Sequence, residues 1–216
     1  MQEVFNVSME ILLFTWLAVL LSTISSIWIS RLYNRNIISL TFPERRIRKS
    51  VFRCYFLPFC YTLFFSRFLL FETLDLFLLQ LTAAFFLLLI ICTDIEQQVI
   101  LNEVIILFSL FSLLSSFIHG PMIADSLMAA FTGGGIFLLL AVLTKGGIGG
   151  GDIKLIFSLG LLLGPDKLMI VIIIGFLLGG CSALVLILTR KKKSGEFFAY
   201  GPYFALPALL IYVSSF

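Results

Sequence analysis

Long apolar runs, separated by short charged or turn-forming segments, dominate this sequence. Hydrophobic residues fill 60% of its 216 positions and charged residues only 12%, and the mean hydropathy is +1.12. Soluble domains carry about one-quarter charged residues, so this chain has too little polar surface for water. Backbone groups in lipid must be paired within the chain, which a helix achieves alone. We therefore predict an all-α polytopic membrane protein.

The lengths of the apolar runs predict eight transmembrane helices in one integral membrane domain, residues 1–216. A spanning helix needs about 20 apolar residues. The sixth run is shorter, and its helix would extend only about 18 Å, so we expect a half-length helix there. The expected spans are 9–30, 54–71, 76–93, 101–118, 122–143, 153–164, 168–189 and 199–216.

The basic residues divide unevenly between the two sides of this predicted bundle. With the N-terminus extracytoplasmic, all of the 15 Lys and Arg residues except Arg67 and Lys167 lie on the cytoplasmic side, as the positive-inside rule requires. Beside apolar spans, such clusters are topology anchors, so we expect contact with the lipid bilayer and no nucleic acid. The cytoplasmic group comprises Arg31, Arg35, Arg45, Arg46, Arg48, Lys49 and Arg53 in a short basic loop (31–53), Lys145, Lys154, and Arg190 to Lys193.

Two aspartates lie at the ends of apolar runs on the predicted cytoplasmic face. Asp94 belongs to the loop 93–103, and Asp152 follows three glycines in the loop 144–154. An acid beside hydrocarbon is costly and indicates function. Two such carboxyl groups in contact would share one proton, and could activate a water and protonate a leaving amine. The glycines would leave room for an extended substrate backbone. The alternative is that each aspartate only caps a helix.

Other chemistries find little support in the sequence. Cys54, Cys60, Cys92 and Cys181 are scattered without a C-x-x-C pair, which argues against a zinc site. The single histidine, His119, lies in a short turn, which does not favour a Ser-His-Asp or Cys-His hydrolase. We expect no metal and no cofactor.

Three segments resemble the type IV prepilin peptidase (prepilin leader peptidase) family of G-x-G-D membrane aspartyl proteases. "GGGDIKL" is similar to the G-x-G-D motif itself. "TDIEQQVILNE" resembles the family's first catalytic loop, with Leu101 where proline is usual and Asn102 after it. "AYGPYFALPALL" is similar to the family's Gly-Pro-aromatic final helix. The resemblance covers roughly residues 77–216.

This resemblance implies an aspartic endopeptidase of the plasma membrane with no cofactor. It would remove the short basic leader of a prepilin or pseudopilin precursor at the cytoplasmic face, for a type IV pilus, competence or type II secretion system. The region 31–53 lacks the paired cysteine motifs associated with N-methylation, so the resemblance does not extend to N-methyltransferase activity. The sequence does not indicate an oligomeric state. The implied site residues are Asp94 and Asp152 as catalytic groups, with Gly149, Gly151, Asn102, Gly201 and Pro202 shaping the motifs or the substrate site.

Two other functions stay open at this level. Proteases of the presenilin and signal-peptide-peptidase type share G-x-G-D, and Leu206 to Leu209 is similar to their Pro-Ala-Leu motif, but they place Tyr where Thr93 stands here. A transporter using Asp94 and Asp152 as a proton or cation site would require acids near mid-span and repeated spans. The sequence shows neither.

The remaining acids and glycines are expected to have structural roles. Glu96 and Glu103 are predicted on solvated surface, although Glu103 could meet a basic leader. Residues 133–135 and the pair Gly175 and Gly179 are predicted to be helix-packing surfaces.

The charge distribution makes a topological prediction. A reporter fused after Gln97 should be cytoplasmic, because the eight-span arrangement places both loops with the aspartates on the side that carries most basic residues. Measuring reporter activity for this fusion checks the orientation, with a fusion after His119 as the opposite-side control. An extracytoplasmic reporter at Gln97 would contradict it.

Overall fold

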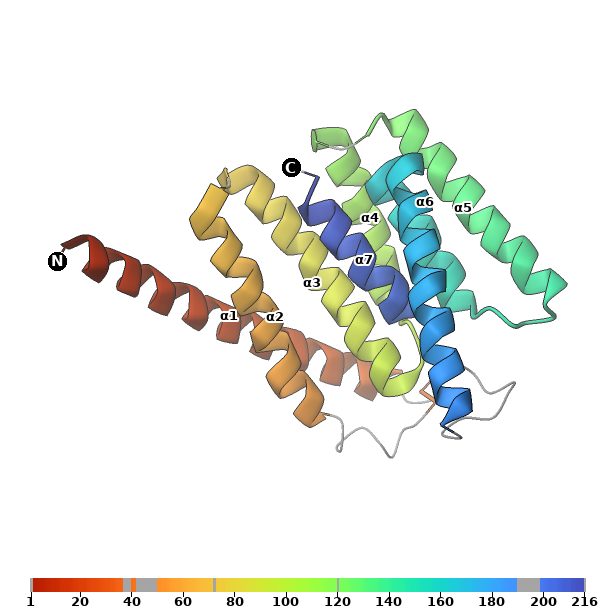
Figure 1. The fold of residues 1–216 in the computed structure, drawn as a ribbon, viewed down its shortest axis with the longest axis horizontal. Helices are drawn as coiled ribbons and strands as arrows, with labels where there is room; N and C mark the ends of the chain where they lie inside the picture. The colour runs from red at the N-terminus through yellow and green to blue at the C-terminus, as the bar shows by residue number, and fades with distance from the viewer. Residues whose placement is uncertain are drawn as a thin grey trace. The chain divides into compact units, whose positions relative to one another are not determined.

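The structure, a computed structural model, describes residues 2–36, 40–41, 50–71, 73–119, 121–189 and 199–215, and all regular secondary structure in these ranges is helical. This confirms the predicted all-α class. Figure 1 shows the helices in chain order. They are α1 (Gln2–Arg35), α2 (Ser50–Phe71), α3 (Leu74–Gln97), α4 (Asn102–His119), α5 (Ile123–Leu143), α6 (Gly150–Leu188) and α7 (Gly201–Val213).

The chain forms two compact units, residues 1–85 and 86–216, and α3 contributes to both. In the first unit α1 packs against α2. In the second unit α6 packs against α4, α5 and α7.

A buried arginine links the two helices of the first unit. Arg53 is 2% exposed, and its Nη1 donates to the Ser26 carbonyl oxygen at 3.2 Å and to the Ser30 hydroxyl at 3.3 Å. Its guanidinium also lies 5.6 Å from the centre of the Tyr33 ring. The prediction that Arg53 belongs to a basic loop is therefore wrong, because α2 begins at Ser50 and carries it into the helix pair.

Other parts of the predicted basic loop are helical or fall outside the described residues. Arg31 and Arg35 belong to the last turns of α1. The remaining predicted anchors lie outside the described residues: Arg45, Arg46, Arg48, Lys49 and Arg190 to Lys193.

Four helical segments of the described chain are long and apolar enough to cross a membrane: Leu12–Arg35, Leu74–Gln97, Ile123–Leu143 and Gly150–Leu186. Segments Asn102–Ile118 and Gly201–Val213 are apolar but shorter. Large hydrophobic side chains on these helices stay exposed, as expected of surfaces that face lipid. The count of eight crossings stays a prediction.

Helix α6 consists of two helices joined at a sharp break. Gly164 has φ 72° and ψ −179°, a conformation that is essentially restricted to glycine. Pro165 follows, and its fixed φ suits the first turn of a new helix. The break divides α6 where the sequence predicts the end of the half-length span 153–164. That half begins earlier than predicted, at Gly150.

Small residues bring α5 and α6 together, as predicted for residues 133–135, with one exception. A Cβ added to Gly160 would lie 2.6 Å from the Ala130 Cα, and one on Gly134 would lie 3.3 Å from the Phe157 Cβ. A Cβ on Gly135 would meet nothing within 4 Å. Gly135 therefore is not part of the packing surface.

The predicted packing role of the second glycine pair is confirmed. A Cβ on Gly179 would lie 2.8 Å from Tyr200 Cε1, and Gly175 abuts the ring of Phe204. These glycines let α7 and the chain before it approach the second half of α6.

The break in α6 generates a stability prediction. Gly164→Ala should lower the free energy of unfolding by about 1–3 kcal/mol, since alanine strongly disfavours this backbone conformation and its Cβ would lie 3.0 Å from Pro121 Cγ. The thermal unfolding midpoint in detergent measures the change. The matched control is Gly180→Ala, whose Cβ would meet nothing within 4 Å. A Gly164→Ala protein that unfolds at the wild-type temperature would contradict the prediction.

Candidate active site

Asp94 lies near the end of α3 and is held by the first residue of α7. Its side chain is 4% exposed, and its Oδ2 accepts the Gly201 backbone N–H at 2.9 Å. Amides at a helix start have no intrahelical acceptor, so the carboxyl group satisfies one of them. A Cβ on Gly201 would lie 2.6 Å from this oxygen. Only glycine permits so close an approach.

Pro202 explains why α7 begins at this point. Proline occupies the first turn of α7, where its missing N–H costs nothing and its fixed φ favours a helix. The predicted motif residues Gly201 and Pro202 therefore supply the helix start that binds Asp94.

Asp152 lies in the first turn of α6 and is 8% exposed. Its backbone N–H donates to the Gly149 carbonyl oxygen at 3.0 Å. A Cβ on Gly149 would lie 3.2 Å from the Asp152 Oδ2. The glycine motif thus forms the turn that leads into α6, and Gly149 packs against the Asp152 carboxyl group.

The carboxyl groups of Asp94 and Asp152 are close enough to interact electrostatically. This brings together the two predicted catalytic residues, both within the unit 86–216. The starts of α6 and α7 meet at the pair, and the positive ends of two helix dipoles offset part of the cost of burying carboxyl groups.

Further contacts join the two segments that carry the aspartates. A Cβ on Gly151 would lie 3.1 Å from the Ile100 Cβ, so Ile100 occupies the space beside Gly151 that we expected to admit substrate. The Lys154 ammonium donates to Asn102 Oδ1 at 2.8 Å. The predicted motif residue Asn102 therefore connects α4 to α6 rather than contacting the carboxyl pair.

The two flanking glutamates differ from each other. Glu96 is 2% exposed, so its predicted position on a solvated surface is wrong. The reason is that α3 continues through Gln97 and carries Glu96 into the packed end of the helix. Glu103 is half-buried in the first turn of α4.

Sequence reasoning missed the amide donor of Gly201 and the packing of Ile100. The Gly-Pro pair signalled a helix start, and free amides at a helix start attract carboxylates. No comparable signal pointed to Ile100. Within the described ranges, no three His, Cys, Asp or Glu side chains are grouped to hold a metal ion.

Residues 81–184 match the model of the type IV leader peptidase family. Over 131 residues the chain is 31% identical to a Bacillus subtilis (strain 168) protein named prepilin leader peptidase/N-methyltransferase, an alignment covering 59% of this chain and 52% of that relative. The chain thus aligns with about half the length of this relative. No solved structure matches the chain.

These matches confirm the resemblance found in the motifs and identify a multi-pass membrane protein. The matched segment includes both aspartates and the glycine motif, whereas Gly201 and Pro202 lie beyond it. Over residues 81–184, just under half of its length, this chain is similar to the type IV leader peptidase family.

Proposed function

We propose that this protein is a membrane-embedded aspartic endopeptidase that removes the basic leader of prepilin or pseudopilin precursors at the cytoplasmic face. The observation that carries this proposal is the buried, interacting pair Asp94 and Asp152 within a leader peptidase segment. The name of the Bacillus subtilis relative supports the substrate class.

The pair contains the groups that peptide hydrolysis needs. On this proposal the pair holds one proton between its two carboxyl groups, because ionising one buried carboxyl group disfavours ionising the other. The ionised group takes a proton from a water molecule, and the water oxygen attacks the scissile carbonyl carbon. The protonated group then gives its proton to the leaving amine as the C–N bond breaks. The hydrogen bond from Gly201 keeps Asp94 in place through both steps.

The position of the pair fits a precursor that lies partly in the membrane. Both carboxyl groups lie at helix ends, so a scissile bond between a basic leader and an apolar segment would reach them near the cytoplasmic interface. Glu103 adds negative charge at the start of α4, on the same side, and would attract the leader. A transporter would instead place its acids near mid-span.

Loss of either carboxyl group should abolish cleavage. Asp94→Asn and Asp152→Asn should each slow precursor processing by about 10²–10⁴-fold, and the double variant should be no worse than the singles, because the pair acts as a unit. Leader removal from a coexpressed precursor, followed by gel shift at matched membrane levels, measures the rates.

Asp125 offers a matched control, since it lies in the first turn of α5. Asp125→Asn should process the precursor at the wild-type rate. Appreciable processing by Asp94→Asn or Asp152→Asn would remove that residue from the proposed site.

The two glycines with close neighbours should matter although they carry no reacting group. Gly201→Ala should displace Asp94, whose oxygen would be 2.6 Å from the new Cβ, and Gly151→Val should clash with Ile100. We expect each to slow cleavage at least about tenfold. Gly135→Ala, with open space around its Cβ, should cleave normally. Wild-type rates for Gly201→Ala would show that the amide contact does not position Asp94.

A further inference from the structure

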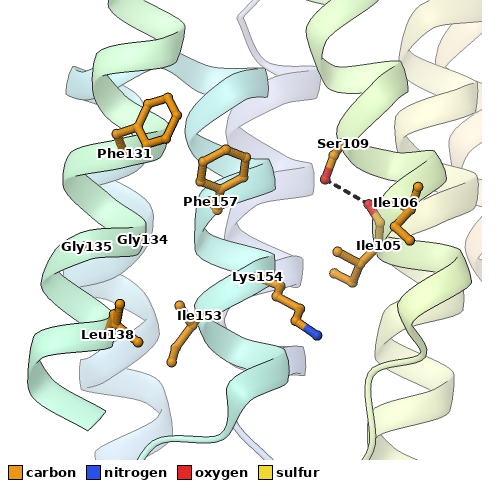
Figure 2. A pocket seen from close by; sticks show the side chains of 10 residues that line it. All are labelled: Ile105, Ile106, Ser109, Phe131, Gly134, Gly135, Leu138, Ile153, Lys154 and Phe157. Carbon is orange, nitrogen blue, oxygen red and sulfur yellow. Dashed lines mark hydrogen bonds between the residues drawn. The ribbon is translucent and has the colours of Figure 1, made fainter. Parts of the chain in front are cut away.

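An open apolar groove of about 480 Å³ runs between α4 and α5, over the first half of α6. Figure 2 shows Phe131 toward one end of the groove and Lys154 and Leu138 toward the other. Phe157 of α6 lies between them and forms part of the floor. Exposed apolar side chains such as Ile106, Phe131 and Leu138 line it, as expected of a surface that faces lipid.

The two glycines of α5 that line the groove give it depth. Gly134 lets α5 approach Phe157, whose Cβ would lie 3.3 Å from an added Cβ, whereas Gly135 faces space with nothing within 4 Å. Phe131 and Leu138 are 68% and 55% exposed. The groove is therefore a hollow in the surface that a narrow apolar chain can enter.

One charged residue, Lys154, lines the groove, and it is exposed. Its ammonium group has three donors, of which one bonds to Asn102. Lys145 is exposed just beyond the end of α5, on the side where α6 begins. An apolar groove with an ammonium group in its lining, and a second lysine in the segment that joins α5 to α6, complements a lipid with an anionic headgroup.

The groove faces away from the carboxyl pair. On a helix with 3.6 residues per turn, Lys154 and Phe157 are rotated roughly 200° and 140° from Asp152. A precursor with its scissile bond at Asp152 would have to pass around α6 to place its apolar helix in this groove. A lipid has no such constraint.

We propose that this groove binds a phospholipid with an anionic headgroup, one acyl chain lying over Gly135 and Phe157 and the headgroup at Lys154 and Lys145. This proposal does not rest on the proposed peptidase activity. It would fix α4 and α5 against α6 on the side opposite the aspartates.

Native mass spectrometry of the full protein in detergent tests the proposal, with added dioleoyl-phosphatidylglycerol or dioleoyl-phosphatidylcholine as probes. Gly135→Leu fills the groove and should weaken binding of the first phosphatidylglycerol molecule about tenfold. The matched control is Gly180→Leu, on an exposed part of α6 with open space around its Cβ; it should bind like wild type.

The headgroup is tested separately by Lys154→Gln, which keeps an N–H donor for Asn102. It should bind both lipids equally, whereas wild type prefers phosphatidylglycerol. The unfolding midpoint of Gly135→Leu shows whether that variant folds. If it does not fold, Lys154→Gln still tests the proposal.

Two outcomes would overturn the proposal. One is a folded Gly135→Leu protein that binds phosphatidylglycerol as wild type does. If this variant also slows precursor cleavage, the groove receives the precursor and not a lipid. The other is an unchanged preference for phosphatidylglycerol in Lys154→Gln.

Discussion

The hydrogen bond from the Gly201 amide to the Asp94 carboxyl group joins segments 107 residues apart in the chain. A buried carboxyl group needs such a partner, because burying it alone costs several kcal/mol. The amide is available only because a helix starts there, and the approach is possible only because the residue is glycine. Phe204 anchors the same helix, with its ring 5.6 Å from both Phe137 and Phe176. The place of Asp94 thus depends on how α7 packs against α5 and α6.

Contacts at the start of α6 hold Asp152 in place. Gly151 packs against Ile100, and the Lys154 ammonium donates a hydrogen bond to Asn102. Both contacts join the glycine turn to the segment that follows α3, so one connected set of residues holds the two aspartates. These contacts would keep the separation of the two carboxyl groups constant, on which the proposed sharing of a proton depends. Residues with no reacting group would then affect the proposed chemistry.

The lengths of the apolar runs predicted the all-α class, and the positions of Asp94 and Asp152 at the ends of apolar runs on one predicted face predicted that they lie close together. Prediction from the sequence failed where the position of a residue depends on tertiary packing. Arg53 and Glu96 were placed in solvated segments because they are charged, yet each lies within a helix whose end is packed. Three consecutive glycines of α5 also differ in role. Gly133 and Gly134 face α6, whereas Gly135 faces the open groove, and the sequence alone does not distinguish them.

The break at Gly164 limits the length of the helix that carries Asp152. From Asp152 to residue 163 the helix rises only about 18 Å, against a hydrocarbon thickness of about 30 Å. This half of α6 is therefore too short to cross a membrane alone, and Asp152 lies in its first turn. A buried carboxyl group needs polar neighbours, and near the end of α3 the side chains of Thr93 and Gln97 are buried with Asp94, at 0% and 1% exposed. The short first half of α6 and the buried polar end of α3 thus both place an aspartate at the end of a helix.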